Sequence, residues 1–276
     1  MESYLSQGLK EFIDELEMAV AGFGLGILLT FQFKPSYVEA EAMEREIKVL
    51  ENIGKANDLI ADENRRVLDG HRVFAFNLMG SPGSGKTSLL EASLRELGKT
   101  YRIAVIEGDL ATSYDAKRIK KLCIEVLQIN TGGMCHLDAA SISKALTHFN
   151  LDEVDLLFIE NVGNLVCPAF FDVGAHRNVI VISTPEGDDK PAKYPVMFKN
   201  ADALIINKID LLPYLEISLE RIRQDAFKIN PKLEIIETSC KTGEGIDSWT
   251  KWLKERFEFY VKRLDCKGDM PPDALL

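Results

Sequence analysis

The sequence lacks the marks of a nucleic-acid-binding, disulfide-stapled or repeat protein. Acidic residues outnumber basic ones by 43 to 33, so the net charge of −10 provides no basic surface for a phosphate backbone. The five cysteines are an odd number scattered along 276 residues, a chain too long to need disulfides, which is typical of a reducing compartment. No internal repeat or low-complexity tract is present. We therefore expect a cytoplasmic globular protein without a nucleic-acid partner.

The only long uncharged stretch, residues 18–33, does not fit a membrane span. A spanning helix needs about 20 apolar residues, and this run is shorter and rich in glycine. The residues before it are acidic, whereas a secretory signal begins with positive charge. We expect residues 1–36 to be an N-terminal extension of unknown role, buried or partly ordered, with an interfacial anchor and a targeting segment as alternatives.

The rest of the chain has the periodicity of an α/β protein. Over residues 37–70, apolar residues recur three or four apart among Glu, Lys and Arg, which predicts an amphipathic helix packed on the domain that follows. Beyond it, helical stretches alternate with short apolar runs, at 73–79, 102–106, 124–129, 156–160, 178–183, 203–207 and 234–237. This alternation predicts a mostly parallel sheet flanked by helices on both faces, with ligands at the carboxyl ends of the strands.

A phosphate-binding loop follows the first apolar run. Gly80–Thr87 reads GSPGSGKT and leads into a helical pattern, which is the strand–loop–helix context of a P-loop. Its backbone N–H groups can hold phosphates, Lys86 can reach the terminal phosphates, and Thr87 can supply an oxygen to Mg²⁺. The residues predicted to form this nucleotide site are Gly80, Ser81, Pro82, Gly83, Ser84, Gly85, Lys86, Thr87 and Ser88. Residues 71–265 are therefore predicted to be a P-loop NTPase domain, followed by a tail at 266–276.

A second motif predicts which base the bound nucleotide carries. Asn207, Lys208 and Asp210 stand at the end of a late strand, and a carboxylate there can accept from both donors on one edge of guanine, which adenine does not offer. Ser239, Cys240 and Lys241 follow a further strand and are expected at the same pocket. Together with the P-loop they predict GTP over ATP. An ATP-dependent kinase is the alternative that this motif opposes.

Two acidic strand ends are candidates for Mg²⁺ and for catalysis. Asp109 follows the second strand and Glu160 ends the fourth, where Mg²⁺ requires carboxylates, and the N–H of Gly163 can sense the γ-phosphate. The predicted catalytic residues are Lys86, Asp109 and Glu160. No glutamine is placed to orient the attacking water, so we expect slow intrinsic hydrolysis.

A soft metal-binding set lies beside this region. Cys135 and His136 are adjacent in a glycine-containing loop, and Cys167 comes four residues after Gly163. Two thiolates and one imidazole suit Zn²⁺ or Ni²⁺, and three ligands leave a tetrahedral site open or completed by a second subunit. The alternative is that these side chains merely pack. Cys123, Cys240, Cys266, His71, His148 and His176 are interpreted as structural.

Several segments of the chain, taken in order, resemble those of a known family. The segments NLMGSPGSGKTSLL, IEGD, QINTGGMCHLDA, ENVGNLVCPAFFD, EGDDKPAKYP and NKIDLLPY occur in the order found in HypB, the hydrogenase nickel-incorporation GTPases. The resemblance extends from about residue 37 to about 264. It implies a metallochaperone that uses GTP to help load nickel into the large subunit of [NiFe] hydrogenase.

The resemblance also implies partners and site residues. It implies a homodimer on nucleotide binding, with Cys135, His136 and Cys167 as metal ligands at its interface, Asp109 and Glu160 as Mg²⁺ and switch residues, and HypA as a partner. Residues 1–70 contain neither cysteine nor histidine, so the nickel-storage motifs of some members are absent. A urease-type accessory GTPase is a rival that the order Cys-His-Leu-Asp disfavours, and a regulatory GTPase without a working metal site is another.

Overall fold

The computed structural model describes residues 37–108 and 119–268. The chain divides into two units, Met1–Lys48 and Val49–Leu276, and helix α2 (Tyr37–Gly70) contributes to both. A helix over the range predicted from periodicity is therefore confirmed. The extension at 1–36, with its uncharged run, lies outside the described residues. Within the described part of the chain, no helix is both long and apolar enough to cross a bilayer.

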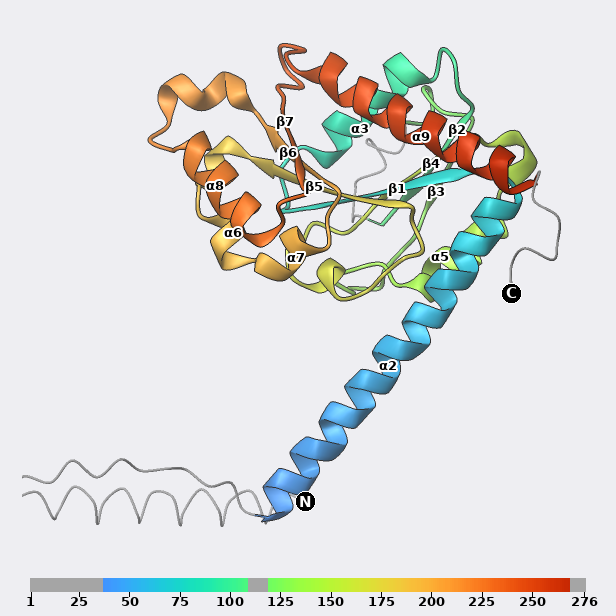
Figure 1. The fold of residues 1–276 in the computed structure, drawn as a ribbon, viewed down its shortest axis with the longest axis vertical. Helices are drawn as coiled ribbons and strands as arrows, with labels where there is room; N and C mark the ends of the chain where they lie inside the picture. Colours follow the sequence, from blue (N-terminus) through green and yellow to red (C-terminus); the bar gives the residue numbers. More distant parts are fainter. Residues whose placement is uncertain (1–36, 109–118, 269–276) are drawn as a thin grey trace, which may run out of the picture. The chain divides into compact units, whose positions relative to one another are not determined.

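A seven-stranded parallel sheet forms the centre of the second unit (Figure 1). Its order is β3-β2-β4-β1-β5-β6-β7. The strands are β1 (Phe74–Gly80), β2 (Ile103–Glu107), β3 (Glu125–Gln128), β4 (Leu156–Glu160), β5 (Arg177–Ser183), β6 (Ala203–Asn207) and β7 (Glu234–Glu237). All seven predicted strands are present, with ends within two residues of the predicted ones. The sheet confirms the predicted fold class.

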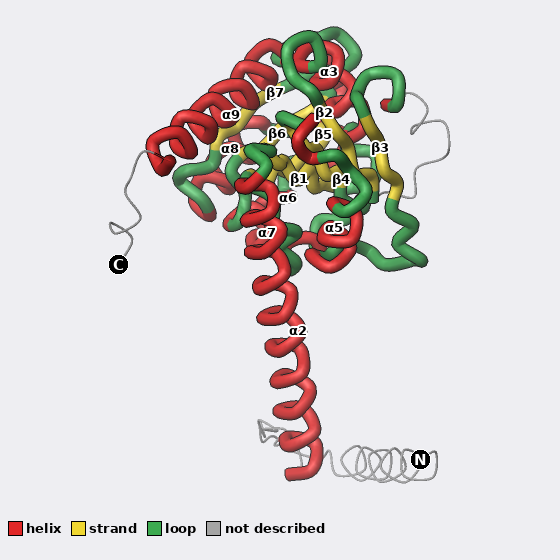
Figure 2. The backbone as a smooth tube through the Cα atoms, turned by 90° about the vertical axis from the view of Figure 1, so that its right-hand side faces the viewer, coloured by secondary structure: helices red, strands yellow, loops and turns green. Residues whose placement is uncertain are grey.

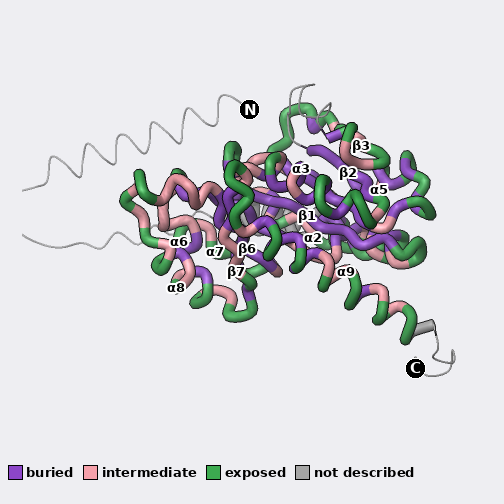
Figure 3. The backbone as a smooth tube through the Cα atoms, turned by 90° about the horizontal axis from the view of Figure 1, so that it is seen from above, coloured by how far each residue is buried: buried purple, intermediate pink, exposed green. Residues whose placement is uncertain are grey.

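The five inner strands, β2, β4, β1, β5 and β6, are nearly continuous apolar runs because both faces of the sheet are covered there. Along β1, Phe74, Phe76 and Leu78 join one hydrophobic cluster, whereas Ala75 and Met79 join clusters on the opposite face. The strands are the most completely buried part of the unit, as Figure 3 shows, and exposed residues gather on the surrounding helices and loops.

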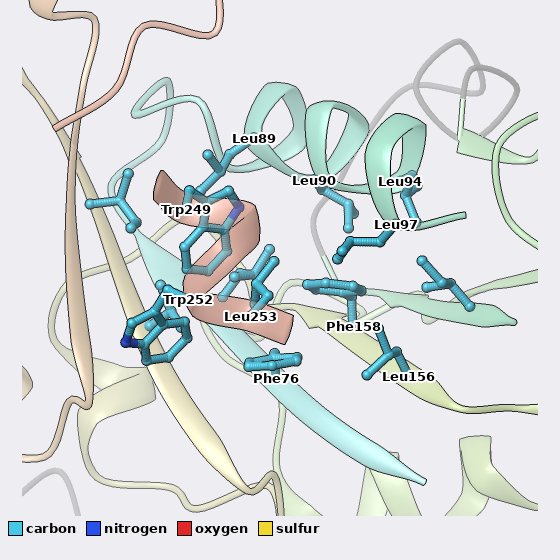
Figure 4. Close-up of a cluster of buried hydrophobic side chains, with 14 of the residues drawn as sticks. Phe76, Leu89, Leu90, Leu94, Leu97, Leu156, Phe158, Trp249, Trp252 and Leu253 are labelled. Atoms are coloured by element: carbon cyan, nitrogen blue, oxygen red, sulfur yellow. The ribbon is translucent and has the colours of Figure 1, made fainter. Parts of the chain in front are cut away.

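Helices α3 (Lys86–Leu97) and α9 (Ile246–Gly268) cover one face. Leucines of α3 and Trp249, Trp252 and Leu253 of α9 pack against Phe76 and Phe158 of the sheet (Figure 4). The indole N–H of Trp249 donates to Ser93 Oγ at 2.8 Å, which satisfies a buried donor within this cluster. Helix α3 begins directly after the P-loop. Its packing against α9 and the sheet therefore fixes the position of its N-terminus beside the loop.

The other face is covered in two parts (Figure 2). Beside β2 and β4, α2 and α5 (Ala139–Leu146) supply Leu68 and Ile142 to one cluster. Beside β5 and β6, α7 (Pro195–Lys199) and α8 (Leu219–Ile229) supply Phe198 and Ile222 to another. The other helices of the described residues are short: α6 (Lys190–Lys193) and the 3-10 turns η1 (Leu151–Glu153), η2 (Cys167–Ala169), η3 (Thr184–Glu186) and η4 (Ile209–Tyr214).

The topology brings the predicted functional segments to one edge. Because all strands are parallel, the loops after β1, β3, β4, β6 and β7 leave the same edge of the sheet. The P-loop follows the central strand, the Cys135 and Cys167 loops follow strands on one side of it, and the Asn207 and Ser239 loops follow strands on the other. The boundaries at 36, 70 and 265, as limits of domains, remain predictions.

Candidate functional site

The P-loop adopts a backbone conformation that only glycine allows at three positions. Gly80, Gly83 and Gly85 have φ values of +155°, +75° and +101°. A Cβ on Gly80 would lie 2.1 Å from the carbonyl oxygen of Val181, and one on Gly85 would lie 2.2 Å from Asn207 Nδ2. The loop therefore packs closely against β5 and β6, so Gly80 and Gly85 are required by space as well as by dihedral angle, whereas Gly83 is required by its dihedral angle alone.

Lys86 and Thr87 point into the region between the P-loop and β4. Lys86 is 3% exposed, and its Nζ donates to the carbonyl oxygens of Gly80 at 3.4 Å and Ser81 at 3.3 Å. Thr87 Oγ1 donates to Glu160 Oε1 at 2.6 Å. Glu160 is also buried and stands opposite Leu78 in the β1–β4 register. The arrangement brings together an ammonium, a hydroxyl and a carboxylate, the kinds of group that bind nucleotide phosphates and Mg²⁺.

The segments predicted to read the base form hydrogen bonds with the P-loop on the side opposite β4. Asn207 Nδ2 donates to the carbonyl of Ser84 at 3.0 Å, and Lys208 Nζ donates to the carbonyl of Gly83 at 2.6 Å. Ser239 Oγ donates to Asp210 Oδ1 at 2.6 Å, which orients that carboxylate. The predicted residues Asn207, Lys208, Asp210 and Ser239 thus form one hydrogen-bonded assembly with the loop.

Further contacts complete this assembly. Asn207 Oδ1 accepts from Thr238 Oγ1 at 3.3 Å and from the backbone N–H of Cys240 at 3.4 Å. Lys208 adopts a left-handed conformation with φ of +63°, and its carbonyl accepts from Thr184 Oγ1 at 2.7 Å. Burial raises the pKa of the Cys240 thiol to about 11, so this thiol is neutral at physiological pH. Cys240 thus takes part in the assembly through its contacts with Asn207. Lys241 lies beside it and is exposed.

The loop after β4 packs directly on the P-loop. A Cβ on Gly163 would lie 3.0 Å from Pro82 Cα, and Asn164 forms an isolated antiparallel bridge with Gly80. Gly163 was predicted to sense the γ-phosphate, and its position beside the P-loop is consistent with that prediction. Asp109, the predicted Mg²⁺ and catalytic residue, lies outside the described residues.

The three predicted metal ligands meet in space. One side-chain ligand atom from each of Cys135, His136 and Cys167 lies within 4.8 Å of the other two, and no other such group occurs among the described residues. Cys135 Sγ is 2.8 Å from Cys167 Sγ and 3.6 Å from His136 Nδ1. Two thiols and an imidazole form a soft donor set that fits Zn²⁺ or Ni²⁺.

Several residues that the sequence analysis missed hold this cluster. The ring of Phe171 stacks on His136 with centroids 4.0 Å apart. Asn161 Oδ1 accepts from the backbone N–H of Leu137 at 3.0 Å, and Asn164 Nδ2 donates to the carbonyl of Cys135 at 3.3 Å. The first and fourth residues after β4, Asn161 and Asn164, therefore hold the Cys135 loop, a link that the asparagines of the ENVGN segment could have suggested.

The surroundings of His136 and Cys167 favour the neutral forms of both side chains. Burial lowers the pKa of His136, which outweighs the opposite effect of Asp138. The hydrogen bond with Cys135 raises the pKa of the Cys167 thiol, and burial adds to this effect. Because a thiol binds a metal as the thiolate, metal binding at Cys167 is coupled to release of its proton.

The other cysteines and histidines lie away from this cluster. None of the five cysteines, all of which fall in the described part of the chain, forms a disulfide. Burial raises the pKa of the Cys123 thiol to about 11. His176 is buried: its Nδ1 accepts from the N–H of Ala75 at 2.9 Å and its Nε2 lies 3.1 Å from Asp69 Oδ1. His176 therefore has the structural role that was expected of it.

The fold and the glycine-rich loop define a P-loop nucleotide-binding protein with a soft metal-binding cluster beside its phosphate loop. A model of the CobW/HypB/UreG nucleotide-binding domain matches residues 74–237. A probable hydrogenase maturation factor HypB of Methanocaldococcus jannaschii is 46% identical over 209 residues, which cover 76% of this chain and 95% of that protein. The chain therefore belongs to the CobW/HypB/UreG family, and within it to the HypB branch.

Solved structures agree with this placement. The crystal structure of the hydrogenase maturation factor HypB from Archaeoglobus fulgidus superposes with a TM-score of 0.70 at 39% identity, covering 74% of this chain and 99% of that one. HypB from Helicobacter pylori in complex with nickel superposes with a TM-score of 0.70 at 38% identity, covering 74% and 95%. Membership of this P-loop family implies nucleotide hydrolysis, and the HypB branch favours hydrogenase maturation over the urease-type alternative.

Proposed function

We propose that this protein hydrolyses GTP and uses the nucleotide state to gate the delivery of nickel to the large subunit of [NiFe] hydrogenase. The observation that carries the proposal is the proximity of two sites. Cys167, a member of the metal-binding cluster, lies four residues after Gly163, which packs against Pro82 of the P-loop. A change in the phosphate loop therefore reaches a metal ligand through one short segment.

The choice of GTP rests on the base-reading assembly. Asp210 is oriented by Ser239 and lies three residues after Asn207, which donates a hydrogen bond to the P-loop. A carboxylate held in this way accepts two hydrogen bonds from guanine and none from the corresponding edge of adenine. The arrangement favours GTP over ATP and opposes the kinase alternative.

The hydrolytic step relies on Lys86, Thr87, Glu160 and Asp109. We propose that Thr87, Asp109 and Glu160 hold Mg²⁺, directly or through its waters, and that the ion, when bound, neutralises charge on the phosphates. Lys86 adds a buried positive charge at the same place. The predicted absence of a water-orienting glutamine is the reason to expect slow hydrolysis of isolated protein.

We propose that the protein forms a homodimer, which would complete the coordination of the metal. Three donors leave a tetrahedral ion with an open position. A second copy of the chain can close the site, and opening of the dimer after hydrolysis would then release nickel to a client. HypA and the hydrogenase large subunit are the partners that the family relationship suggests, in a reducing cytoplasm that keeps the thiols available.

Nickel binding tests the proposal most directly. Wild-type protein, Cys167→Ala and the exposed-cysteine control Cys266→Ala should each be dialysed against nickel with GDP and with a non-hydrolysable GTP analogue, with oligomer size followed by light scattering. We expect wild type and Cys266→Ala to form a dimer with the analogue and to bind nickel in a nucleotide-dependent way, and Cys167→Ala to lose nickel binding. Equal, weak binding in all samples would overturn metal delivery and leave a regulatory GTPase.

Phosphate release tests the base assignment separately. Release from GTP should exceed release from ATP at equal concentrations below saturation. Equal rates with the two nucleotides would refute the proposed role of Asp210 without affecting the metal experiment.

A further inference from the structure

Two asparagines on α2 face the loops that carry the metal ligands. Asn57 and Asn64 lie seven residues apart, so they occupy the same face of the helix two turns apart. Both are buried, with exposures of 8% and 2%. A buried amide is costly to leave without partners, and the partners of these two amides are therefore informative.

Each asparagine bridges the same two segments. Asn57 Oδ1 accepts from the backbone N–H of Ala139 at 2.9 Å, and its Nδ2 donates to the carbonyl of Asp172 at 2.8 Å. Asn64 Nδ2 donates to the carbonyl of Ala139 at 2.8 Å and to the carbonyl of Val173 at 3.2 Å. Both polar groups of the Ala139 backbone are thus held by one helix, which also holds two consecutive residues of the second segment.

The two bridged segments are those of the metal-binding cluster. Ala139 comes three residues after His136 and four after Cys135, and Asp172 comes five residues after Cys167. Between Cys167 and Asp172 lies Phe171, whose ring stacks on His136. A third bond strengthens the second connection, because Arg65 Nη2 donates to Asp172 Oδ2 at 2.6 Å.

We propose that Asn57 and Asn64 are positioning residues of the metal site, which fix the separation of the Cys135–His136 loop from the Cys167 loop. Asn161 and Asn164 connect the same loops on the side of the nucleotide, whereas the α2 asparagines connect them through a helix that carries no metal ligand. Both loops are thus held in place by hydrogen bonds to α2. The identity of the metal rests on the proposed function, but the positioning of the thiols does not.

A metal-free measurement tests the positioning. In the apo protein, diamide oxidises Cys135 and Cys167 to a disulfide: the two thiols lose two protons and two electrons, which reduce diamide to the hydrazine. We expect Asn57→Ala to slow this reaction by about tenfold, because the effective concentration of one thiol at the other falls. Peptide mapping by mass spectrometry distinguishes this disulfide from products of the other cysteines.

A matched control separates positioning from general loss of stability. Asn230, which follows α8, also bridges two backbone carbonyls, those of Phe198 at 3.1 Å and Ala201 at 2.8 Å, but neither segment carries a metal ligand. Asn230→Ala should lower thermal stability comparably and leave the rate of disulfide formation unchanged. Asn57→Asp, which keeps an acceptor for Ala139 but cannot donate to Asp172, should give an intermediate rate.

Nickel titration provides the second readout. Following the thiolate-to-nickel charge-transfer absorption, we expect Asn57→Ala to weaken nickel affinity by about 10- to 100-fold relative to wild type, as for other residues that orient metal ligands. Guanine-nucleotide affinity should be unchanged, and Asn230→Ala should bind nickel as wild type does.

The outcomes distinguish this inference from the proposed function. If wild type binds no nickel but Asn57→Ala still slows disulfide formation, the proposed function fails and the positioning role stands. If Asn57→Ala and Asn230→Ala match each other in both the disulfide rate and nickel affinity, the positioning role is overturned. Asn57 lies outside the three hydrophobic clusters, so the variant is expected to retain the folded core.

Discussion

The base-reading side of the sheet and the metal-binding side are held in different ways. On the base side, Asn207 and Asp210 are oriented by hydrogen bonds to the P-loop and to Ser239, and Asn207 is 1% exposed. On the metal side, the Cys135 side chain is exposed, and its loop is connected to the rest of the fold mainly through backbone groups.

This difference in burial and hydrogen bonding suits the two tasks proposed for these sites, base recognition and metal delivery. A site that must discriminate one base from another gains from donors and acceptors fixed before the ligand arrives. A site that must pass on its cargo needs ligands that are accessible and loops that can be displaced. The same sheet edge thus carries a buried, hydrogen-bonded set of residues and an exposed thiol, and the following predictions test that contrast.

The largest expected effect separates hydrolysis from metal binding. Lys86→Ala removes the buried ammonium of the P-loop and should slow phosphate release from GTP by about a hundredfold to a thousandfold. Nickel affinity without nucleotide should stay at the wild-type value, because the metal ligands follow other strands. Lys99→Ala, at an exposed ion pair with Glu96, is the control for hydrolysis. A parallel loss of nickel affinity in Lys86→Ala would break the contrast.

Acid should weaken the support behind the metal side. Burial lowers the pKa of His176 from 6.5 to about 4, so between these values the unfolded chain binds a proton that the folded chain does not. Its contribution to stability is complete above about pH 6.5 and is lost as the pH falls toward 4, amounting to about 3 kcal/mol. Urea unfolding at several pH values measures this loss.

A variant isolates the histidine from other titrating groups. His176→Asn keeps an acceptor near Ala75 but does not titrate, so the decline in its free energy of unfolding between pH 6.5 and 4 should be shallower than that of wild type. The exposed His148→Gln variant should follow wild type. Identical slopes for all three proteins would show that His176 does not contribute.

Base recognition should depend in a graded way on Asp210 and its partner. Asp210→Ala should weaken GTP affinity by about a hundredfold, since two charge-assisted hydrogen bonds are lost, and should leave weak ATP binding unchanged. Ser239→Ala, which frees the Asp210 carboxylate and removes the acceptor of the Thr242 N–H, should weaken GTP affinity by about tenfold. Fluorescent-nucleotide titration measures both. An equal loss for GTP and ATP would contradict base reading by Asp210.

The smallest expected effect concerns the ring that backs His136. Phe171→Leu keeps an apolar side chain but removes the stacked ring, so nickel affinity should fall by about threefold, in line with the modest energy of an aromatic pair. Phe227→Leu, at an exposed position of α8, is the control. A fall as large as that expected for Asn57→Ala would mean that stacking, rather than the α2 asparagines, sets the position of the ligands.

Much of this arrangement could be predicted from local sequence. Each strand is a short apolar run bounded by glycine or charge, and the P-loop, Asn207–Asp210 and Cys135–His136 are contiguous motifs whose chemistry is readable in order. Cys167 could be assigned to the metal site because the parallel topology brings successive strand ends to one edge.

What escaped prediction are contacts between distant segments. Asn57 and Asn64 occur in a helix full of charged residues, where an asparagine normally faces water, and only the packing of α2 shows that they hold loops about 80 and 110 residues further along the chain. The stacking of Phe171 on His136 and the pairing of His176 with Asp69 have the same origin. The sequence periodicity that predicts helices and strands does not indicate which distant residue a side-chain amide or ring will contact.

The closeness of Gly163 to Pro82 has a kinetic consequence. Loop rearrangements take nanoseconds to microseconds, whereas hydrolysis without a water-orienting glutamine is expected to be slow. Because the P-loop and the Cys167 segment are in contact, no slow conformational step between them would delay release of the metal after hydrolysis. The residence time of the cargo would then equal the lifetime of the bound GTP, and the chain would act as a timer whose interval is set by its poor catalysis.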